Sequence, residues 1–148
     1  MILQLTGEQL HLLKAEAKRS HPVEACALLF GKRDEERATV KKVVVAPNRL
    51  KSTVRFEMDP QLVYAAFEEA DQEGLQFIGL FHSHPAPAVP SSVDLKYMEL
   101  WGDAIWLILS STEDRAAAFQ LTDVKIREVT INLINKFPLR VIGEGDTV

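Results

Sequence analysis

The spacing of hydrophobic residues, together with the capping residues beside them, predicts three helices in this chain. Thr6 and Gln9 form a capping-box pattern, and the apolar residues after them recur at steps of three and four. This pattern predicts an amphipathic helix to about Lys18. An aspartate followed by proline predicts a second helix over 59–73, because these residues favour the cap and the first helical position. A short third helix is expected after the proline-rich loop at 85–90.

Apolar runs of strand length separate the predicted helices. The mixed-charge segment Lys32–Arg37 is interpreted as a solvated turn between two of these strands. Strands and helices alternate in the first half, and strands follow one another in the second. The pattern therefore predicts an α/β (α+β) protein with a mixed β-sheet flanked by helices. The predicted strands are Ala25–Phe30, Thr39–Ala46, Val54–Met58, Gln76–His82, Ala104–Ser110, Arg115–Leu121 and Val124–Ile131.

Length and composition predict one globular domain. The chain has 148 residues, of which 47% are hydrophobic and 26% charged, so it can bury a core without disulfides or metal staples. No linker or repeat divides the sequence. We expect a single domain over 1–142, followed by a polar, frayed C-terminal tail at 143–148.

Charge and cysteine content narrow the class of protein. Lys and Arg number 17 against 21 Asp and Glu, which gives a net charge of −4. This charge does not indicate the positive surface that binding to nucleic acid or an anionic membrane requires. No apolar run reaches transmembrane length, so no membrane partner is expected. The single cysteine, Cys26, cannot form an internal disulfide and fits a reducing compartment. We therefore expect a cytoplasmic protein.

Two neighbouring histidines are the strongest candidates for chemistry. His82 and His84 are two residues apart, so on an extended backbone both imidazoles point the same way. Asp94 follows at the start of the predicted short helix, where the loop could return its carboxylate to them. Two imidazoles and one carboxylate form a three-ligand set for zinc that leaves a fourth position for water. The plainer interpretation is two ordinary strand-end histidines and a carboxylate at a helix N-terminus.

The residues around these candidates resemble a known family. His82–Pro85 followed by Pro90–Asp94 resembles the His-x-His-Pro … Ser-x-x-Asp signature of the JAMM (MPN+) metalloprotease family. The block His21–Gly31 is similar to the family's upstream Pro-x-Glu-x-Cys-x-x-Leu-x-Gly pattern. The resemblance extends over about Leu5 to Leu121. It implies the cytidine-deaminase-like JAMM/MPN fold and a zinc-dependent peptidase or isopeptidase of the deubiquitinase type.

The resemblance also implies a role for each site residue. His82, His84 and Asp94 would hold Zn2+, with water as the fourth ligand. Glu24 would act as general base on that water and then pass the proton to the leaving amine. Ser91 would donate a hydrogen bond to the oxyanion of the tetrahedral intermediate.

Three alternatives remain open at this point. Ser92 competes with Ser91 both as helix cap and as oxyanion donor. The family typically has ten residues between the second histidine and the aspartate, whereas Pro85–Val93 gives nine. A misplaced Asp94 would leave two ligands, so a catalytically silent MPN-type scaffold is the alternative function. A deaminase-type zinc hydrolase fits poorly, because the chain lacks a Pro-Cys-x-x-Cys block.

The same resemblance implies a class of substrate. Only Leu95–Asp103 separates the last predicted ligand from the next strand, which is too short for the insertion of eukaryotic deubiquitinases. We therefore expect a prokaryotic-type minimal member that acts on the C-terminal tail of a ubiquitin-like or sulfur-carrier protein. A homodimer is compatible with the family, although no heptad or apolar stripe argues for one. Cys26 is expected to be a small buried hydrophobe rather than a nucleophile.

Overall fold

A computed structural model gives the structure of the chain and describes residues 1–123 and 125–135. Within this part of the chain there are three helices and seven strands; helices are interspersed among the first strands, and the last three elements are strands, as expected for a mixed α+β protein. In chain order they are β1 (Ile2–Thr6), α1 (Gly7–Ser20), β2 (Cys26–Arg33), β3 (Arg37–Ala46), α2 (Pro60–Gln72), β4 (Gln76–His84), α3 (Ser92–Leu100), β5 (Ile105–Ser110), β6 (Arg115–Thr122) and β7 (Lys125–Ile134).

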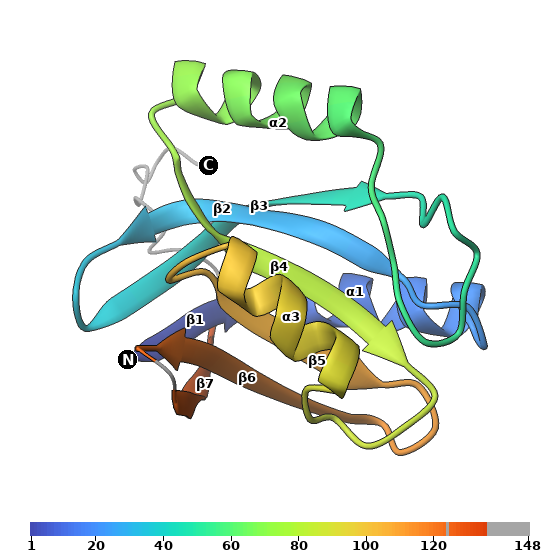
Figure 1. The fold of residues 1–148 in the computed structure, drawn as a ribbon. Helices are drawn as coiled ribbons and strands as arrows, with labels where there is room; N and C mark the ends of the chain where they lie inside the picture. Colours follow the sequence, from blue (N-terminus) through green and yellow to red (C-terminus); the bar gives the residue numbers. More distant parts are fainter. Residues whose placement is uncertain (124, 136–148) are drawn as a thin grey trace.

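The strands form a closed barrel in the order β1-β3-β2-β4-β5-β6-β7 (Figure 1). β1 closes it by pairing in parallel with both β3 and β7. β4 and β5 are also parallel, and the other neighbours are antiparallel. The predicted mixed sheet flanked by helices is therefore confirmed, and its closure into a barrel is a feature that the hydrophobic pattern did not predict.

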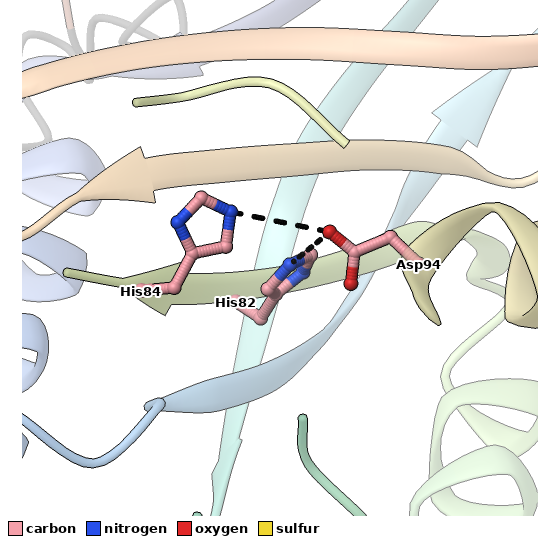
Figure 2. A group of neighbouring side chains, drawn as sticks. All are labelled: His82, His84 and Asp94. Carbon is pink, nitrogen blue, oxygen red and sulfur yellow. Dashed lines mark hydrogen bonds and ion pairs between the residues drawn. The ribbon is translucent and has the colours of Figure 1, made fainter. Parts of the chain in front are cut away.

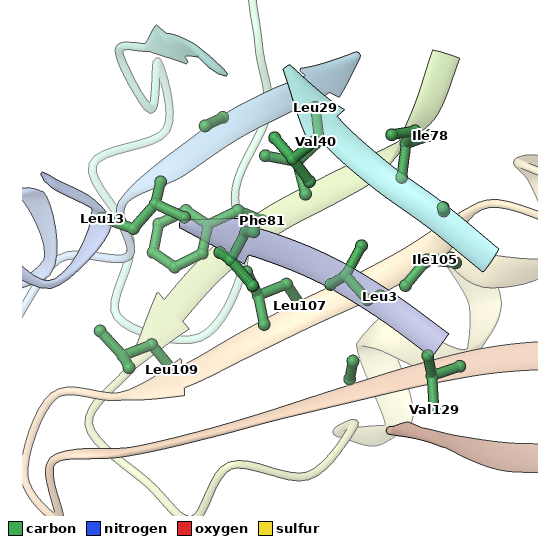
Figure 3. Packing of buried hydrophobic residues seen from close by; sticks show 14 of the residues in the cluster. Leu3, Leu13, Leu29, Val40, Ile78, Phe81, Ile105, Leu107, Leu109 and Val129 are labelled. Atoms are coloured by element: carbon green, nitrogen blue, oxygen red, sulfur yellow. The ribbon is translucent and has the colours of Figure 1, made fainter. Parts of the chain in front are cut away.

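Side chains that point into the barrel form one core. This inner cluster contains buried residues from every strand, together with Leu13 and Ala17 of α1. Figure 3 shows Leu13 beside the strand residues of the cluster. Because successive strand residues face opposite sides, β2 places Ala27 and Leu29 inside, and Ala25 directly before the strand follows the same alternation. The inner cluster consists of Leu3, Leu5, Leu13, Ala17, Ala25, Ala27, Leu29, Ala38, Val40, Ile78, Phe81, Ile105, Leu107, Leu109, Ala118 and Val129.

A second core lies between the outside of the barrel and the helices α2 and α3, which cover this face in Figure 1. Its members alternate with those of the inner cluster along β2 and along the second half of β4. The outer cluster consists of Cys26, Leu28, Phe30, Ala46, Phe56, Met58, Ala66, Ala70, Leu80, Ala88, Met98, Ala104, Trp106, Ile108, Ala117 and Phe119. Both faces of β2, β4 and β5 are thus buried, which explains their continuous apolar runs.

The helix boundaries follow the predicted caps. Thr6 and Gln9 form the expected capping box at the start of α1. Asp59 caps α2, where its carboxylate accepts a hydrogen bond from the Gln61 amide at 2.9 Å. Beyond the end of α2, Gly74 has φ of +74°, a conformation that glycine adopts without steric cost. These local signals therefore position both helices correctly.

The prediction of a strand at Val54–Met58 is wrong, because no strand forms there. The segment runs extended over the outer cluster, where it buries Phe56 and Met58 while Val54 stays exposed. This alternation of exposure mimics a strand. The backbone N–H of Glu57 and the backbone C=O of Arg55, however, bond to a side chain rather than to a neighbouring strand.

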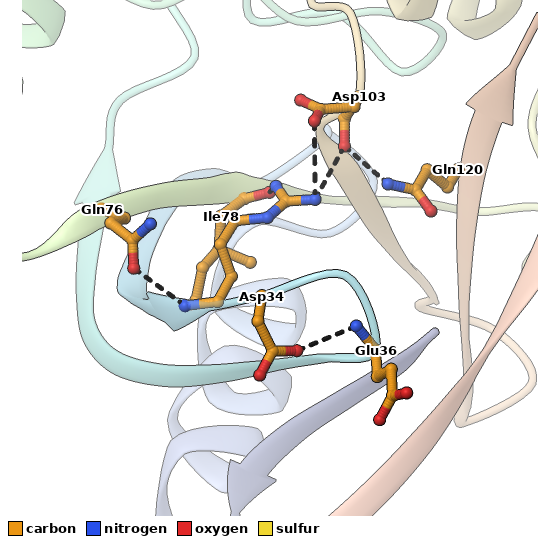
Figure 4. A network of polar contacts seen from close by, with 7 residues as sticks. Asp34, Glu36, Gln76, Ile78, Asp103 and Gln120 are labelled. Atoms are coloured by element: carbon orange, nitrogen blue, oxygen red, sulfur yellow. Dashed lines mark hydrogen bonds and ion pairs between the residues drawn. The ribbon is translucent and has the colours of Figure 1, made fainter.

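The charged segment Lys32–Arg37 also differs from its prediction as a solvated turn. Its first two residues belong to β2, and the side chain of Arg33 is only 14% exposed. The guanidinium donates hydrogen bonds to the backbone oxygens of Ile78 at 3.2 Å and Asp103 at 3.3 Å (Figure 4). The Gln120 amide donates to the same Asp103 oxygen. Arg33 thus links β2 to β4 and to the connection before β5.

The remaining predicted strands agree with the structure except at their ends. β1 was not predicted, although Leu3 and Leu5 alternate with polar residues and are fully buried. Val124, the predicted start of the last strand, and the predicted tail at 143–148 lie outside the described residues. No described helix is long and apolar enough to cross a membrane.

Candidate metal centre

The two histidines lie at the end of β4 on the outer face of the barrel. The strand is two residues longer than predicted, so both His82 and His84 belong to it. On one side His82 is opposite Cys26 of the antiparallel β2, and on the other it is level with Ile108 of β5. The backbone oxygen of His84 accepts a hydrogen bond from the Ser111 amide at 3.0 Å. Paired backbone on both sides therefore fixes the direction of the two imidazoles.

Asp94 reaches the histidines from the first turn of α3. Ser91 caps this helix: its Oγ accepts the Asp94 amide at 3.1 Å, while Asp94 Oδ2 accepts the Ser91 amide at 2.9 Å. The same Oδ2 lies 3.1 Å from His82 Nε2 and 3.9 Å from His84 Nε2 (Figure 2). The shorter loop of nine residues therefore still brings the carboxylate to both histidines.

The cap also assigns different places to the two candidate serines. Ser91 is the N-cap, and Ser92 is the first residue of α3 and is exposed. Of the two, Ser91 is therefore the serine that contacts Asp94.

The carboxyl group of Asp94 is buried but favours its ionised form. Burial alone would raise its pKa. The hydrogen bond with His82, the nearby imidazoles and the Ser91 amide outweigh burial, so the pKa lies below its ordinary value. A negatively charged oxygen therefore faces two imidazole nitrogens, which is the charge arrangement that a cation requires.

The site has buried nitrogen atoms that no described protein group satisfies. Both ring nitrogens of His84 and Nδ1 of His82 have no hydrogen-bond partner within the described residues. The potential ligand atoms of His82, His84 and Asp94 all lie within 4.8 Å of one another. Buried polar atoms are rarely left unpaired, so this cluster fits a bound metal. Two imidazoles with one carboxylate, and few ligands in total, suit a catalytic zinc ion.

Aromatic rings surround His82 with an apolar wall. Phe56 stacks on its imidazole, with ring centroids 5.1 Å apart and an angle of 27° between the planes. Trp106 of β5 meets it edge-on at 5.8 Å. Trp106 is buried in the outer cluster. These rings exclude water from one side of the site, which strengthens electrostatic interactions within it.

Glu24 lies beside this cluster, two residues before β2 begins. Cys26 pairs with His82, so continuing the same antiparallel register places Glu24 opposite His84. The Ser83 Oγ accepts the Ala25 amide at 3.0 Å and extends the contact between the two chain segments. The Glu24 side chain is buried, and its Oε1 has no partner within the described residues. The register therefore places Glu24 beside the end of β4 that carries the two histidines.

Burial raises the pKa of Glu24 to about 7. The nearby His82 opposes this rise, and the negative charge of Asp94 adds to it. A carboxyl group with such a pKa exchanges protons near neutral pH, which is the property that a general acid–base catalyst needs. Its electrostatic coupling to both His82 and Asp94 also reflects their closeness.

Cys26 behaves as the sequence predicts. Burial, followed by the charge of Glu24, raises the pKa of its thiol to about 12. The Sγ donates to the Ala46 backbone oxygen at 3.4 Å. The cysteine therefore stays protonated and unreactive at neutral pH.

Sequence reasoning missed three residues that support the site: Ser83, Asn48 and Phe56. Asn48 donates to the backbone oxygen of Glu24, and Ser83 accepts from the amide of the next residue, Ala25. Phe56 stacks on His82. The available signals were a polar residue between two histidines and an asparagine two residues after a strand. Neither signal predicts which distant residue is contacted.

Comparison with known proteins identifies close relatives of the chain. The model of the family described as prokaryotic homologs of the JAB domain matches residues 8–123. A desampylase from Pyrococcus furiosus is 44% identical over 82% of this chain and 85% of its own length. A CysO-cysteine peptidase from Mycobacterium tuberculosis is 26% identical over 92% of this chain and 94% of its own. The solution structure of protein DSY2949 from Desulfitobacterium hafniense superposes with a TM-score of 0.83 at 30% identity, covering 92% of this chain and 95% of that one.

Proposed function

Because this chain belongs to the family of prokaryotic homologs of the JAB domain, we propose that it is a zinc-dependent peptidase of the JAMM type. Its substrate would be an amide bond at the C-terminal tail of a ubiquitin-like or sulfur-carrier protein. Relatives named desampylase and CysO-cysteine peptidase support this class of substrate. The observation that carries the proposal is the convergence of His82, His84 and Asp94 beside the buried carboxyl group of Glu24.

Three side chains would hold the metal, namely those of His82, His84 and Asp94. Zinc bound there would polarise the scissile carbonyl and lower the pKa of water from 15.7 towards about 7. A metal held there would also give the His84 imidazole, whose ring nitrogens are buried without a hydrogen-bond partner within the described residues, a partner. Asp94 supplies negative charge, and its capping bonds with Ser91 hold the carboxylate in place.

Glu24 moves the proton in this mechanism. As water oxygen attacks the carbonyl carbon of the substrate, the carboxylate takes one water proton and becomes a carboxylic acid. When the C–N bond breaks, the acid returns that proton to the leaving amine and is again a carboxylate. Burial, which raises the pKa of Glu24 to about 7 in the metal-free protein, supports this role, because the group must both accept and release a proton.

Ser91 can serve the reaction while it caps α3. Its Oγ accepts the Asp94 amide through a lone pair, so the hydroxyl proton remains available for donation. We assign this proton to the oxygen that becomes negative during attack. One such donor contributes about 3–4 kcal/mol to transition-state stabilisation in enzymes that use one.

The experiment combines metal analysis with cleavage. Purified untagged protein, Asp94→Ala and Glu24→Ala are analysed for zinc by elemental analysis. Each is then assayed on a ubiquitin-fold protein whose diglycine tail is fused to a reporter peptide. We expect close to one zinc per chain and cleavage in the parent, neither in Asp94→Ala, and zinc without turnover in Glu24→Ala. The expected loss of turnover is about 10²–10⁴-fold.

Two results would contradict the proposal. Negligible zinc in the parent, even after reconstitution, would favour the alternative of a silent scaffold. Near-normal cleavage by Glu24→Ala would show that Glu24 is not the general base.

A further inference from the structure

The side chain of Asn48 uses its entire hydrogen-bonding capacity at the junction of β3 and the segment 47–58. Its amide nitrogen donates to the backbone oxygens of Glu24 and Arg55, both at 3.1 Å. Its Oδ1 accepts the amides of Leu50 and Glu57, also at 3.1 Å. An asparagine offers two donor hydrogens and two acceptor lone pairs, so all four are engaged.

The segment 47–58 holds the backbone of Glu24 from both sides. The Glu24 amide donates to the Ser52 backbone oxygen at 2.9 Å, and the Glu24 oxygen accepts from Asn48. Glu24 lies just before β2 begins, so both its peptide groups bond to this segment. Among the described contacts, Asn48 is the side chain that closes this clamp.

The carboxyl group of Glu24 depends on its backbone for its position. Its Oε1 is buried and has no hydrogen-bond partner within the described residues. A side chain that polar contacts do not restrain takes its place from the Cα that carries it and from packing around it. The bonds to Asn48 and Ser52 therefore fix the backbone from which the carboxyl group extends.

The same segment reaches the metal ligands at its other end. Arg55 and Glu57, which both bond to Asn48, flank Phe56. The ring of Phe56 stacks on His82 at 5.1 Å. One side chain thus connects the residue proposed as base to the ring that covers a proposed metal ligand.

We propose that Asn48 is a positioning residue for the reaction, which holds Glu24 and the segment 47–58 in a preformed arrangement beside the metal site. This inference rests on the proposed function of Glu24 as general base. Preformed geometry matters because a displacement of about 1 Å can lower a rate about 10²-fold. Removing the amide should therefore lower kcat more than it raises KM.

The test uses two substitutions at Asn48 and one control. Asn48→Ala removes all four bonds, whereas Asn48→Asp keeps acceptor oxygens for Leu50 and Glu57 and loses both donors. Thr53→Ala is the control, since Thr53 is exposed in the same segment. We expect kcat about 10- to 100-fold lower in both Asn48 variants, with KM within about 2-fold and zinc stoichiometry unchanged. Thr53→Ala should match the parent.

A second measurement needs neither metal nor substrate. Hydrogen exchange of the Glu24 amide, followed by NMR in metal-free protein, reports directly on the clamp. We expect this amide to exchange about 10-fold faster or more in Asn48→Ala, while amides in the middle of β2 and β4 keep their parental rates. A merely global loss of stability would accelerate all of them together.

The outcomes separate this inference from the proposed function. An active parent with an equally active Asn48→Ala and unchanged exchange of the Glu24 amide would overturn the role of Asn48 alone. A drop in zinc stoichiometry in both Asn48 variants would also overturn it, because the effect would then act through the metal ligands. An inactive parent would overturn the proposed function and, with it, the positioning role.

Discussion

At the scale of single residues, Glu24 combines burial with a titratable group. Its pKa is about 7 in the folded protein and 4.5 as the ordinary value, so the folded state binds the proton more tightly. The stability that this difference contributes is complete below about pH 4.5 and is lost as the pH rises through about 7.

This titration leads to a prediction for Glu24→Gln in metal-free protein. The variant cannot ionise, so relative to the parent it should gain free energy of unfolding between about pH 5 and pH 8, by at most about 3 kcal/mol. Urea denaturation of both proteins in the presence of a chelator measures the difference. A difference that does not depend on pH would contradict the raised pKa.

The spacing of His82, His84 and Asp94 led to residues that do lie together, because a strand and a capped helix each constrain their own side chains. The supporting residues were less accessible. No sequence pattern singled out Asn48, and its partner Glu24 is 24 positions away. Contacts of this kind depend on how distant segments of the chain pack together. The local spacing of residues in the sequence does not predict that packing.

At the scale of elements, the contact between β4 and β5 depends on a glycine. A Cβ at Gly79 would lie 1.8 Å from the backbone oxygen of Ile105, so the two strands approach too closely for any side chain. Gly79 is level with Ile105 at the start of the parallel pair that ends at His84. The position of the histidines therefore depends on this close approach.

We expect Gly79→Ala to lower the free energy of unfolding by about 3 kcal/mol or more, since two backbones must separate. Its zinc affinity should fall as well. Gly7→Ala is the control, because a Cβ there meets nothing within 4 Å. Urea denaturation and zinc titration of the three proteins test this, and a Gly79→Ala variant as stable as Gly7→Ala would contradict it.

Arg33 connects elements at a distance from the site. Arg33→Met keeps much of the aliphatic stem but leaves the oxygens of Ile78 and Asp103 without its donors. We expect a loss of about 1–3 kcal/mol in the free energy of unfolding. Arg115→Met, at an exposed position of β6, should change it by less than about 0.5 kcal/mol. Equal effects of the two substitutions in urea denaturation would show that the buried guanidinium contributes little.

Elements were predictable where local chemistry decides them and less so elsewhere. The caps at Thr6, Asp59 and Ser91 act within one turn, so the helix starts agree with the structure. Val54–Met58 has the alternation of a strand but lies over the outer cluster without a pairing partner. Hydrophobic alternation predicts which side chains of an extended segment are buried. It does not predict whether another strand lies close enough to pair with that segment.

At the scale of the whole molecule, metal binding should couple to folding. The proposed ligands come from two separate elements, β4 and α3, and the unfolded chain does not hold them together. At free zinc about 100-fold above its dissociation constant, we expect the parent to gain about 2.7 kcal/mol in the free energy of unfolding. Asp94→Ala should gain little. Denaturation with zinc and with chelator measures both, and identical gains would place the metal elsewhere.

Closure of the barrel was the hardest feature to predict. It requires β1 to pair in parallel with β3 and β7, which lie far apart in the sequence. Strand count and alternation supported a mixed sheet, and the JAMM resemblance supported its fold class. The expected single domain, cytoplasmic location and homodimer stay predictions.

The two clusters on opposite faces of the barrel wall have a consequence for how this protein can vary over evolution. Along the end of β4, Phe81 belongs to the inner cluster, whereas Leu80 belongs to the outer one and His82 lies on the same outer face. A substitution at Leu80 therefore acts on packing in the outer cluster, and one at Phe81 acts on packing inside the barrel. Both sets must keep their volume for the chain to fold, so neighbouring residues of one strand vary under two separate packing constraints.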